Sequence, residues 1–303
     1  MSAGGRNDGR LLTATSVPAT APVPPAEGWP TVRALARAEA RRYARHPLFV
    51  LPCLVLLVVM VIDVARQNGG GTDPMVATMT TAFLLGVFGF VVAHRLTTSM
   101  LRSRELAGTV PVGRQQRTLA LCLACLVPAT AGTVAAVYMV VVGALWPPDG
   151  DPSSLPVAWF GDYPALEVLA VLLAMGPLAT LGGPLLGVAV ARWAPFRGSA
   201  LLGVVVLVVW TAFPASDDRG GAARLAAAWP VLFDEHVGAH EKIVSTTMVG
   251  SIDPFWALGW VLCLCGLAAV AALLRDPEHR RALLAAGAGL AVGAAACFVL
   301  AVA

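Results

Sequence analysis

The cysteines are the first side chains to consider for chemistry, because two cysteines separated by two residues have the spacing of metal and redox sites. Cys122 and Cys125 form such a pair. All six cysteines of the chain nevertheless fall within strongly apolar stretches, and no histidine or second cysteine pair lies near this one. Small, apolar thiols in such stretches are usually packing residues. We therefore predict neither a disulfide nor a metal at these cysteines.

Two histidines form a second candidate site. His236 and His240 are spaced four residues apart beside a group of acids, Asp234, Glu235 and Glu241. The arrangement resembles half of a metal site, but no third ligand is evident, and a charged surface loop explains the same residues. The chain also lacks His-Glu-x-x-His and Gly-x-Ser-x-Gly motifs. We expect no catalytic residue, no metal site and no cofactor held by this chain.

The lysine content excludes one further chemistry. The chain has a single lysine, Lys242, so a phosphate-binding Gly-x-x-x-x-Gly-Lys-Ser/Thr loop cannot be formed. Any ATP-driven process would therefore need an ATPase on a separate polypeptide.

The elements that would position these residues are apolar helices. The chain is 57% hydrophobic and 13% charged, and its mean hydropathy is +0.75. A helix needs roughly 20 apolar residues to cross a hydrocarbon core about 30 Å thick. Seven stretches approach this length: 48–66, 76–94, 119–146, 164–191, 198–214, 254–274 and 282–303. We predict an all-helical, multi-pass membrane protein with six or seven spans, since 282–303 is rich in alanine and glycine and need not cross.

Charge between these stretches predicts their orientation. With the N-terminus in the cytoplasm, fifteen of the arginines between residues 33 and 281 fall on the inner side and four basic residues on the outer side, where most acids also lie. Cationic loops are retained on the cytoplasmic side of a membrane. We expect a plasma-membrane protein with a cytoplasmic N-terminus, and we attribute the net charge of +3 to these loops rather than to nucleic-acid binding.

The region before the first span divides into two parts. Residues 1–30 are rich in Gly, Pro, Ala, Ser and Thr, and we predict a disordered cytoplasmic tail. Residues 31–47 carry Arg33, Arg37 and Arg41 at four-residue intervals. This spacing places the three arginines on one helical face and predicts an amphipathic helix in the headgroup plane. A simple positively charged stop before the first span is the alternative. Residues 48–303 would form the transmembrane domain.

Charge within the spans is scarce. Asp63 and Glu167 fall near the outer ends of their stretches. An acid near the membrane midplane, which ion-driven transport would require, is therefore missing. Pro177 and Pro184 lie within the fourth stretch, beside glycines. Proline bends helices and glycine allows close approach, so these positions are either hinges or packing points.

Two longer connections complete the chain. The inner loop 95–117 is the cytoplasmic surface large enough to bind a partner, and the outer loop 215–253 is apolar enough to be partly re-entrant or interfacial. In the inner loop the sequence reads Arg104-Glu105-x-x-Gly108-Thr109, followed by Pro111-x-x-Arg114.

Together these features resemble the membrane permease of type-2 ATP-binding-cassette (ABC) transporters, especially actinobacterial ones, over most of 31–274. The resemblance implies that 31–47 is the connecting (elbow) helix and that 98–117 holds the coupling helix, which docks on an ATPase. It implies a coupling role for six residues: Arg102, Arg104, Glu105, Gly108, Pro111 and Arg114. It also implies an ATPase partner carrying ATP and Mg²⁺, and a second permease copy or homologue. The family commonly has six spans, so 282–303 is a departure.

We therefore expect the permease subunit of an exporter for a hydrophobic or amphipathic substrate, without enzymatic activity of its own. A non-catalytic membrane scaffold or assembly protein is one alternative. A membrane-embedded enzyme is another, and it would require His236, His240 or Asp234 to be essential.

Overall fold

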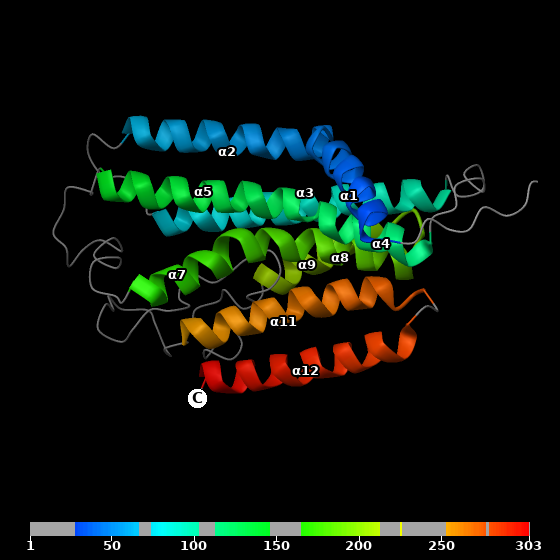
Figure 1. Ribbon diagram of the computed structural model, residues 1–303. Helices are drawn as coiled ribbons and strands as arrows, with labels where there is room; N and C mark the ends of the chain where they lie inside the picture. The colour runs from blue at the N-terminus through cyan, green and yellow to red at the C-terminus, as the bar shows by residue number, and fades with distance from the viewer. Residues whose placement is uncertain are drawn as a thin grey trace, which may run out of the picture.

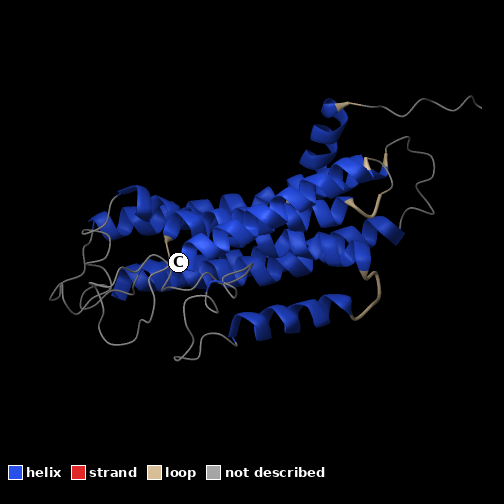
Figure 2. Ribbon diagram, turned by 90° about the horizontal axis from the view of Figure 1, so that it is seen from below, coloured by secondary structure: helices blue, strands red, loops and turns tan. Residues whose placement is uncertain are grey.

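The computed structural model describes residues 28–66, 74–102, 113–145, 165–212, 225, 253–276 and 279–302. The described residues form helices and connections, with no strand among them (Figure 1, Figure 2). The helices are α1 (Trp29–Ala44), α2 (Pro47–Arg66), α3 (Pro74–Arg102), α4 (Arg114–Ala124), α5 (Leu126–Leu145), α7 (Ala165–Leu173), the π-helical turn η1 (Ala174–Leu178), α8 (Ala179–Trp193), α9 (Ser199–Ala212), α11 (Pro254–Leu273) and α12 (Arg280–Val302). The all-helical prediction is confirmed for the described residues.

Four helical stretches are long and apolar enough to cross a membrane: Thr81–Arg102, Arg114–Tyr138, Pro254–Leu273 and Arg280–Ala301. A fifth span is formed if the bent pair Trp29–Ala44 and Pro47–Ile62 is counted as one. The described helices thus support a membrane protein, with four or five clear spans where the sequence suggested six or seven.

Two predicted spans need separate description. In the stretch 198–214 the described residues form α9, 14 residues that end at Ala212, and 213–214 lie outside them. The stretch 164–191 becomes three consecutive pieces, α7, η1 and α8. Pro177 lies inside η1, and because proline supplies no N–H, the hydrogen-bond ladder widens there into a π turn.

The remaining predicted helices are close to their expected bounds. The helix predicted from residue 31 begins two residues earlier, at Trp29, with Pro30 in its first turn. Its N-terminal residues were predicted to belong to the tail, of which 1–27 lie outside the described residues. The stretch 119–146 forms α4 and α5, which are separated by a turn at Cys125.

Capping groups explain two helix starts. The Asp253 carboxylate accepts hydrogen bonds from the backbone N–H groups of Phe255 and Trp256, at 2.9 and 3.2 Å, and begins α11. His46 begins α2 in the same manner, because its Nδ1 accepts from the Leu48 N–H at 3.2 Å. These bonds satisfy backbone donors that the first turn of a helix leaves unpaired.

The helices α3 and α8 form the centre of the bundle. Gly183 and Gly187 of α8 lie directly against the carbonyl oxygens of Gly86 and Phe90 of α3, and a Cβ at either glycine would collide with that backbone. Glycines four residues apart leave a groove that admits a neighbouring helix to backbone contact, which strengthens van der Waals packing in a membrane.

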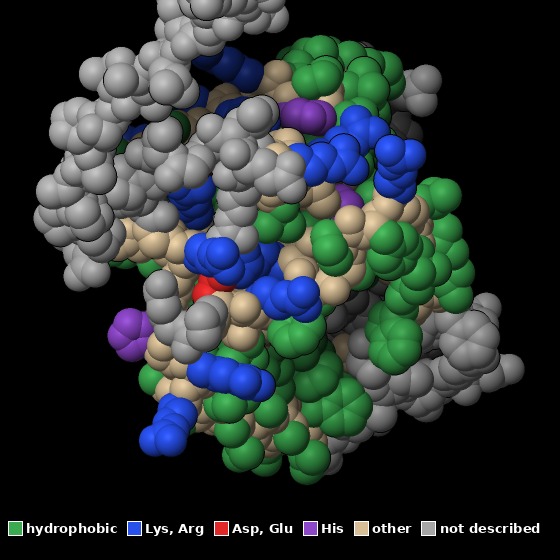
Figure 3. Space-filling model, turned by 90° about the vertical axis from the view of Figure 1, so that its right-hand side faces the viewer, with side chains coloured by type: hydrophobic (Ala, Val, Ile, Leu, Met, Phe, Trp, Pro, Cys, Tyr) green, Lys and Arg blue, Asp and Glu red, His purple; other side chains and the backbone are tan. Residues whose placement is uncertain are grey.

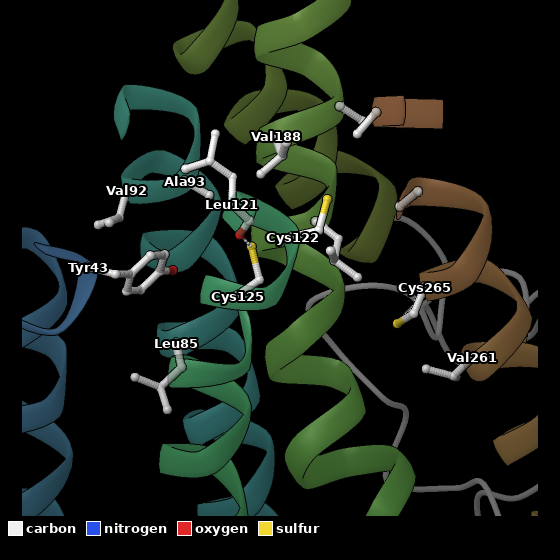
Figure 4. Close-up of a cluster of buried hydrophobic side chains, with 14 of the residues drawn as sticks. Tyr43, Leu85, Val92, Ala93, Leu121, Cys122, Cys125, Val188, Val261 and Cys265 are labelled. Atoms are coloured by element: carbon white, nitrogen blue, oxygen red, sulfur yellow. Dashed lines mark hydrogen bonds between the residues drawn. The ribbon is translucent and has the colours of Figure 1, made fainter. Parts of the chain in front are cut away.

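A cluster of buried apolar side chains surrounds this contact. It draws Tyr43 from α1, Leu85 from α3, Cys122 from α4, Val188 from α8 and Val261 from α11. Figure 4 shows these side chains lying between their five helices. The core is therefore shared by segments that lie far apart in the sequence, and α12, at the margin, packs chiefly on α11.

Candidate functional site at the arginine-rich end

One end of the bundle gathers the basic residues. The helices run up and down, so the start of α4, the ends of α3, α8 and α11 and the start of α12 meet at this end beside α1 (Figure 1). Arginine side chains crowd the corresponding face in Figure 3. Among the described residues, arginines of α1, of the ends of α3 and α8 and of the starts of α4 and α12 lie at this end.

A buried ion pair lies at this end. Arg192, in the last turn of α8, and Asp276, in the turn after α11, are 2.6 Å apart between Nη2 and Oδ1, and their side chains are 3% and 4% exposed. Thr118 Oγ1 of α4 donates a hydrogen bond to Asp276 Oδ2 at 3.3 Å. Arg192 Nε has no hydrogen-bond partner among the described residues. The pair therefore joins three segments in a setting of low polarity.

The energetics of such a pair are asymmetric. Removing both charges together is often tolerated, whereas removing one partner leaves an uncompensated buried charge and costs about 3–5 kcal/mol. The Arg192 charge is also well placed at a helix C-terminus, where the helix dipole favours cations. The arrangement fits a structural role, and its loss should weaken the packing of all three segments that it joins.

Further contacts hold the α11–α12 turn to the same place. His279, which has a φ of 54°, lies with its Nδ1 3.2 Å from Gln115 Oε1 of α4. Trp193 Nε1 of α8 donates to the Ala271 carbonyl at 2.8 Å. The last turn of α11 and the connection to α12 thus contact α8 and α4 through separate residues.

Helix α1 is attached to the same end by its apolar face. Tyr43 is 1% exposed, and its hydroxyl donates to the Gly89 carbonyl of α3 at 3.0 Å. The three arginines of the predicted basic face, Arg33, Arg37 and Arg41, are all exposed, and α1 is bent by 60° from α2. The interfacial amphipathic helix and its location at a membrane surface stay predictions.

Ser199 and His94 connect α9 to α3 near this end. Ser199 Oγ donates to the Phe196 carbonyl at 2.8 Å and therefore accepts from His94 Nε2, which is also 2.8 Å away. Since the serine proton is directed to a backbone carbonyl, the histidine does not activate it as a nucleophile. The contact is structural.

The predicted coupling residues divide into two groups. Arg102, at the end of α3, and Arg114, at the start of α4, are exposed at the arginine-rich end. The other four, Arg104, Glu105, Gly108 and Pro111, lie outside the described residues. The described arginines therefore flank the segment to which the prediction assigned the docking role.

The two predicted hinge prolines have different surroundings. Pro177 interrupts the helix ladder in η1, where Thr180 Oγ1 donates to the carbonyls of Gly176, at 2.9 Å, and Pro177, at 3.0 Å. Pro184 is buried against Gly89 of α3. The surroundings of Pro184 fit the packing alternative, and only Pro177 lies at a break in the helix.

The residues first considered for chemistry do not form a site among the described segments. Cys122 and Cys125 are buried, and Cys125 Sγ donates to the Leu121 carbonyl of the preceding helix α4 at 3.3 Å. No group of three metal-ligating side chains occurs in the described ranges. His236, His240 and the outer loop 215–253 lie outside them, except for Leu225 and Asp253, and so do the side chains of Asp63 and Glu167.

Sequence reasoning missed the Arg192–Asp276–Thr118 cluster. Arg192 and Asp276 fall in different short connections of the sequence, and neither was singled out, because charged residues beside turns are usually solvated. A usable signal was present: Asp276 is one of few acids among the arginine-rich connections, and an isolated acid there requires a cationic partner.

Comparison with known proteins adds no relative. No protein-family model, curated protein or solved structure matches the chain. The described helices establish an all-helical bundle with four or five segments able to cross a membrane.

Proposed function

We propose that this chain is the permease subunit of an ABC-type exporter, which moves a hydrophobic or amphipathic substrate across the plasma membrane. The observation that carries the proposal is the meeting of three features at one end of the bundle: the exposed arginine face of α1, the two arginines that flank the α3–α4 connection, and the buried ion pair. A separate motor that docks there would contact the first two and move the third.

The energy source is a partner subunit. The single lysine of the chain excludes a phosphate-binding loop of its own. ATP and Mg²⁺ are accordingly bound by the ATPase, and a second permease copy or homologue completes the pathway. No nucleic acid takes part, because the arginines are those of membrane-flanking connections.

The ion pair offers a route for the motion. Displacement of the 103–112 segment acts first on the start of α4, where Thr118 contacts Asp276. Asp276 is paired with Arg192 of α8, so the displacement reaches α8 and the α11–α12 turn together. The π turn at Pro177 then allows α7 and α8 to change their relative angle. Packed elements of this kind respond by switching between two arrangements rather than by bending continuously.

The test begins with the full chain purified from its native membranes in mild detergent and with any ATPase that accompanies it. ATP hydrolysis is measured after reconstitution in liposomes. We expect the double variant Glu105→Ala/Arg114→Ala to lose stimulation of the ATPase while it inserts normally, because the charge-assisted contacts at the docking segment are gone.

Arg197→Ala is the matched control. Arg197 is an exposed arginine at the same end of the bundle, in the turn between α8 and α9, and its loss should leave stimulation unchanged. Unaltered stimulation in the double variant would contradict the docking role. Absence of any ATPase in the purified material would instead favour a membrane scaffold.

A further inference from the structure

An apolar groove runs between α2 and α5. Cys53, Leu56 and Met60 on α2 face Ala131 and Ala135 on α5, and Leu85 of α3 forms the floor. The hollow has a volume of about 260 Å³. The two alanines explain it, because on the α5 wall they leave space that a larger side chain would fill.

The groove opens to the side of the bundle. Its rim residues Leu57, Val61 and Val134 are 57%, 57% and 69% exposed. The outer face of α2 around them carries further exposed aliphatic residues, such as Leu54 and Val58. An aliphatic face of this kind lies in the hydrocarbon region of a bilayer, and so the mouth of the groove faces lipid.

Physical chemistry restricts what can fill this hollow. Water needs several polar partners in a cavity, and the lining is almost wholly apolar. If the hollow stays empty, the side chains that line it lose dispersion contacts. The surrounding medium supplies one filler of the right shape, a flexible alkyl chain. The lining residues of α2 run from Cys53 to Val61, a length of about 12 Å at 1.5 Å per residue.

We propose that this groove is a binding site for one alkyl chain of a bilayer phospholipid. The chain lies between α2 and α5, against Leu85. Tyr138 also lines the groove, and α5 continues beyond it to Leu145. The ring of Tyr138 adds apolar surface to the site.

Selectivity comes from the shape of the groove, because transfer from bilayer to groove removes no apolar surface from water. The site does not depend on the proposed function, and it needs neither ATP nor a partner subunit. Its failure and that of the exporter hypothesis can therefore be distinguished: the lipid site is tested on this chain alone.

The experiment uses the full chain in phosphatidylcholine nanodiscs that contain a small fraction of a phospholipid with a photoreactive diazirine on one acyl chain. After illumination, adducts are mapped by mass spectrometry. We expect labelling of groove residues to exceed, by about fivefold (about 1 kcal/mol), that of equally exposed residues on α12 such as Val292, which is 70% exposed.

Two variants fill the groove to different extents, Ala135→Phe and the milder Ala131→Leu. Both should reduce groove labelling to the α12 level, and Ala131→Leu keeps the test valid if the larger residue prevents folding. Ala285→Phe, at an exposed position on α12, is the control and should leave the pattern unchanged. Labelling that merely follows exposure, or that persists in a folded filled variant, would overturn the proposal.

Discussion

The α3–α8 pair and helix α12 are both rich in small residues, yet they occupy opposite positions in the bundle. In the pair, Gly183 and Gly187 touch the backbone of the neighbouring helix. In α12, Gly289 has nothing within 4 Å, and only 6% of the apolar window is buried. The difference teaches that small residues allow close packing but do not determine where it happens. A complementary backbone on the partner helix is also required.

The largest effect is expected at the ion pair that joins the α11–α12 turn to α8. Asp276→Ala removes the acid that pairs with Arg192 and leaves a buried charge without compensation. We expect a loss of about 3–5 kcal/mol in the free energy of unfolding, measured by SDS titration in mixed micelles. The double variant Arg192→Met/Asp276→Ala should recover most of this loss, and the exposed neighbour variant Arg275→Ala should have little effect. A small loss in Asp276→Ala would show that the charge is solvated.

The second prediction tests the comparison directly. Gly183→Ala and Gly187→Ala each place a Cβ against the α3 backbone, which cannot move aside as a flexible side chain could. We expect each to destabilise the protein by about 1–3 kcal/mol. Gly289→Ala, the matched change on α12, should be neutral or slightly stabilising, because alanine is the better helix former. Equal effects at the three glycines would contradict the distinction between the closely packed α3–α8 pair and the exposed helix α12.

A third prediction compares two hydrogen bonds between α1 and α3, one buried and one exposed. Tyr43→Phe removes the buried hydrogen bond to the Gly89 carbonyl, and we expect a loss of about 0.5–1.5 kcal/mol. Arg42→Ala removes the exposed bond to Ser99 Oγ, which has a length of 3.0 Å, and should cost less. The same SDS titration measures both, and the reverse order would contradict the assignment of α1 to the core.

The smallest effect is a pH dependence at the bend between α1 and α2. Burial, with Arg95 and Arg42 nearby, lowers the pKa of His46 below its usual 6.5, so the fold favours the neutral ring. Neutral Nδ1 accepts the capping hydrogen bond from Leu48, and protonation removes that acceptor. Stability from His46 is therefore complete above pH 6.5 and is lost as the pH falls below it, through the lowered pKa of the folded state.

The measurement for His46 compares melting temperatures between pH 7.5 and pH 5 for the native protein and for His46→Asn. Asparagine caps a helix without titrating in this range, so the variant should lose this part of the pH dependence. A pH dependence that is the same in both proteins would assign it to other groups.

The sequence predicted correctly that these stretches form helices, but it did not predict where a helix is interrupted. Helices occur at every predicted span, because a period of apolar residues at this length leaves few alternatives. The stretch 164–191 was taken as one continuous span, although its helix is divided by η1. The exposed arginines of α1 were also predicted, since their spacing alone defines a face. The membrane orientation and the coupling role of 98–117 stay predictions.

By itself, the sequence determined that this chain is a set of apolar helices with arginine-rich connections, because hydropathy and charge are local properties. Only the tertiary structure decided that α3 and α8 meet at glycine, that α12 lies at the margin, and that Arg192 finds Asp276 across 84 residues of sequence. The physical reason is that a buried contact depends on the shape and charge of two surfaces at once, and no single segment contains both.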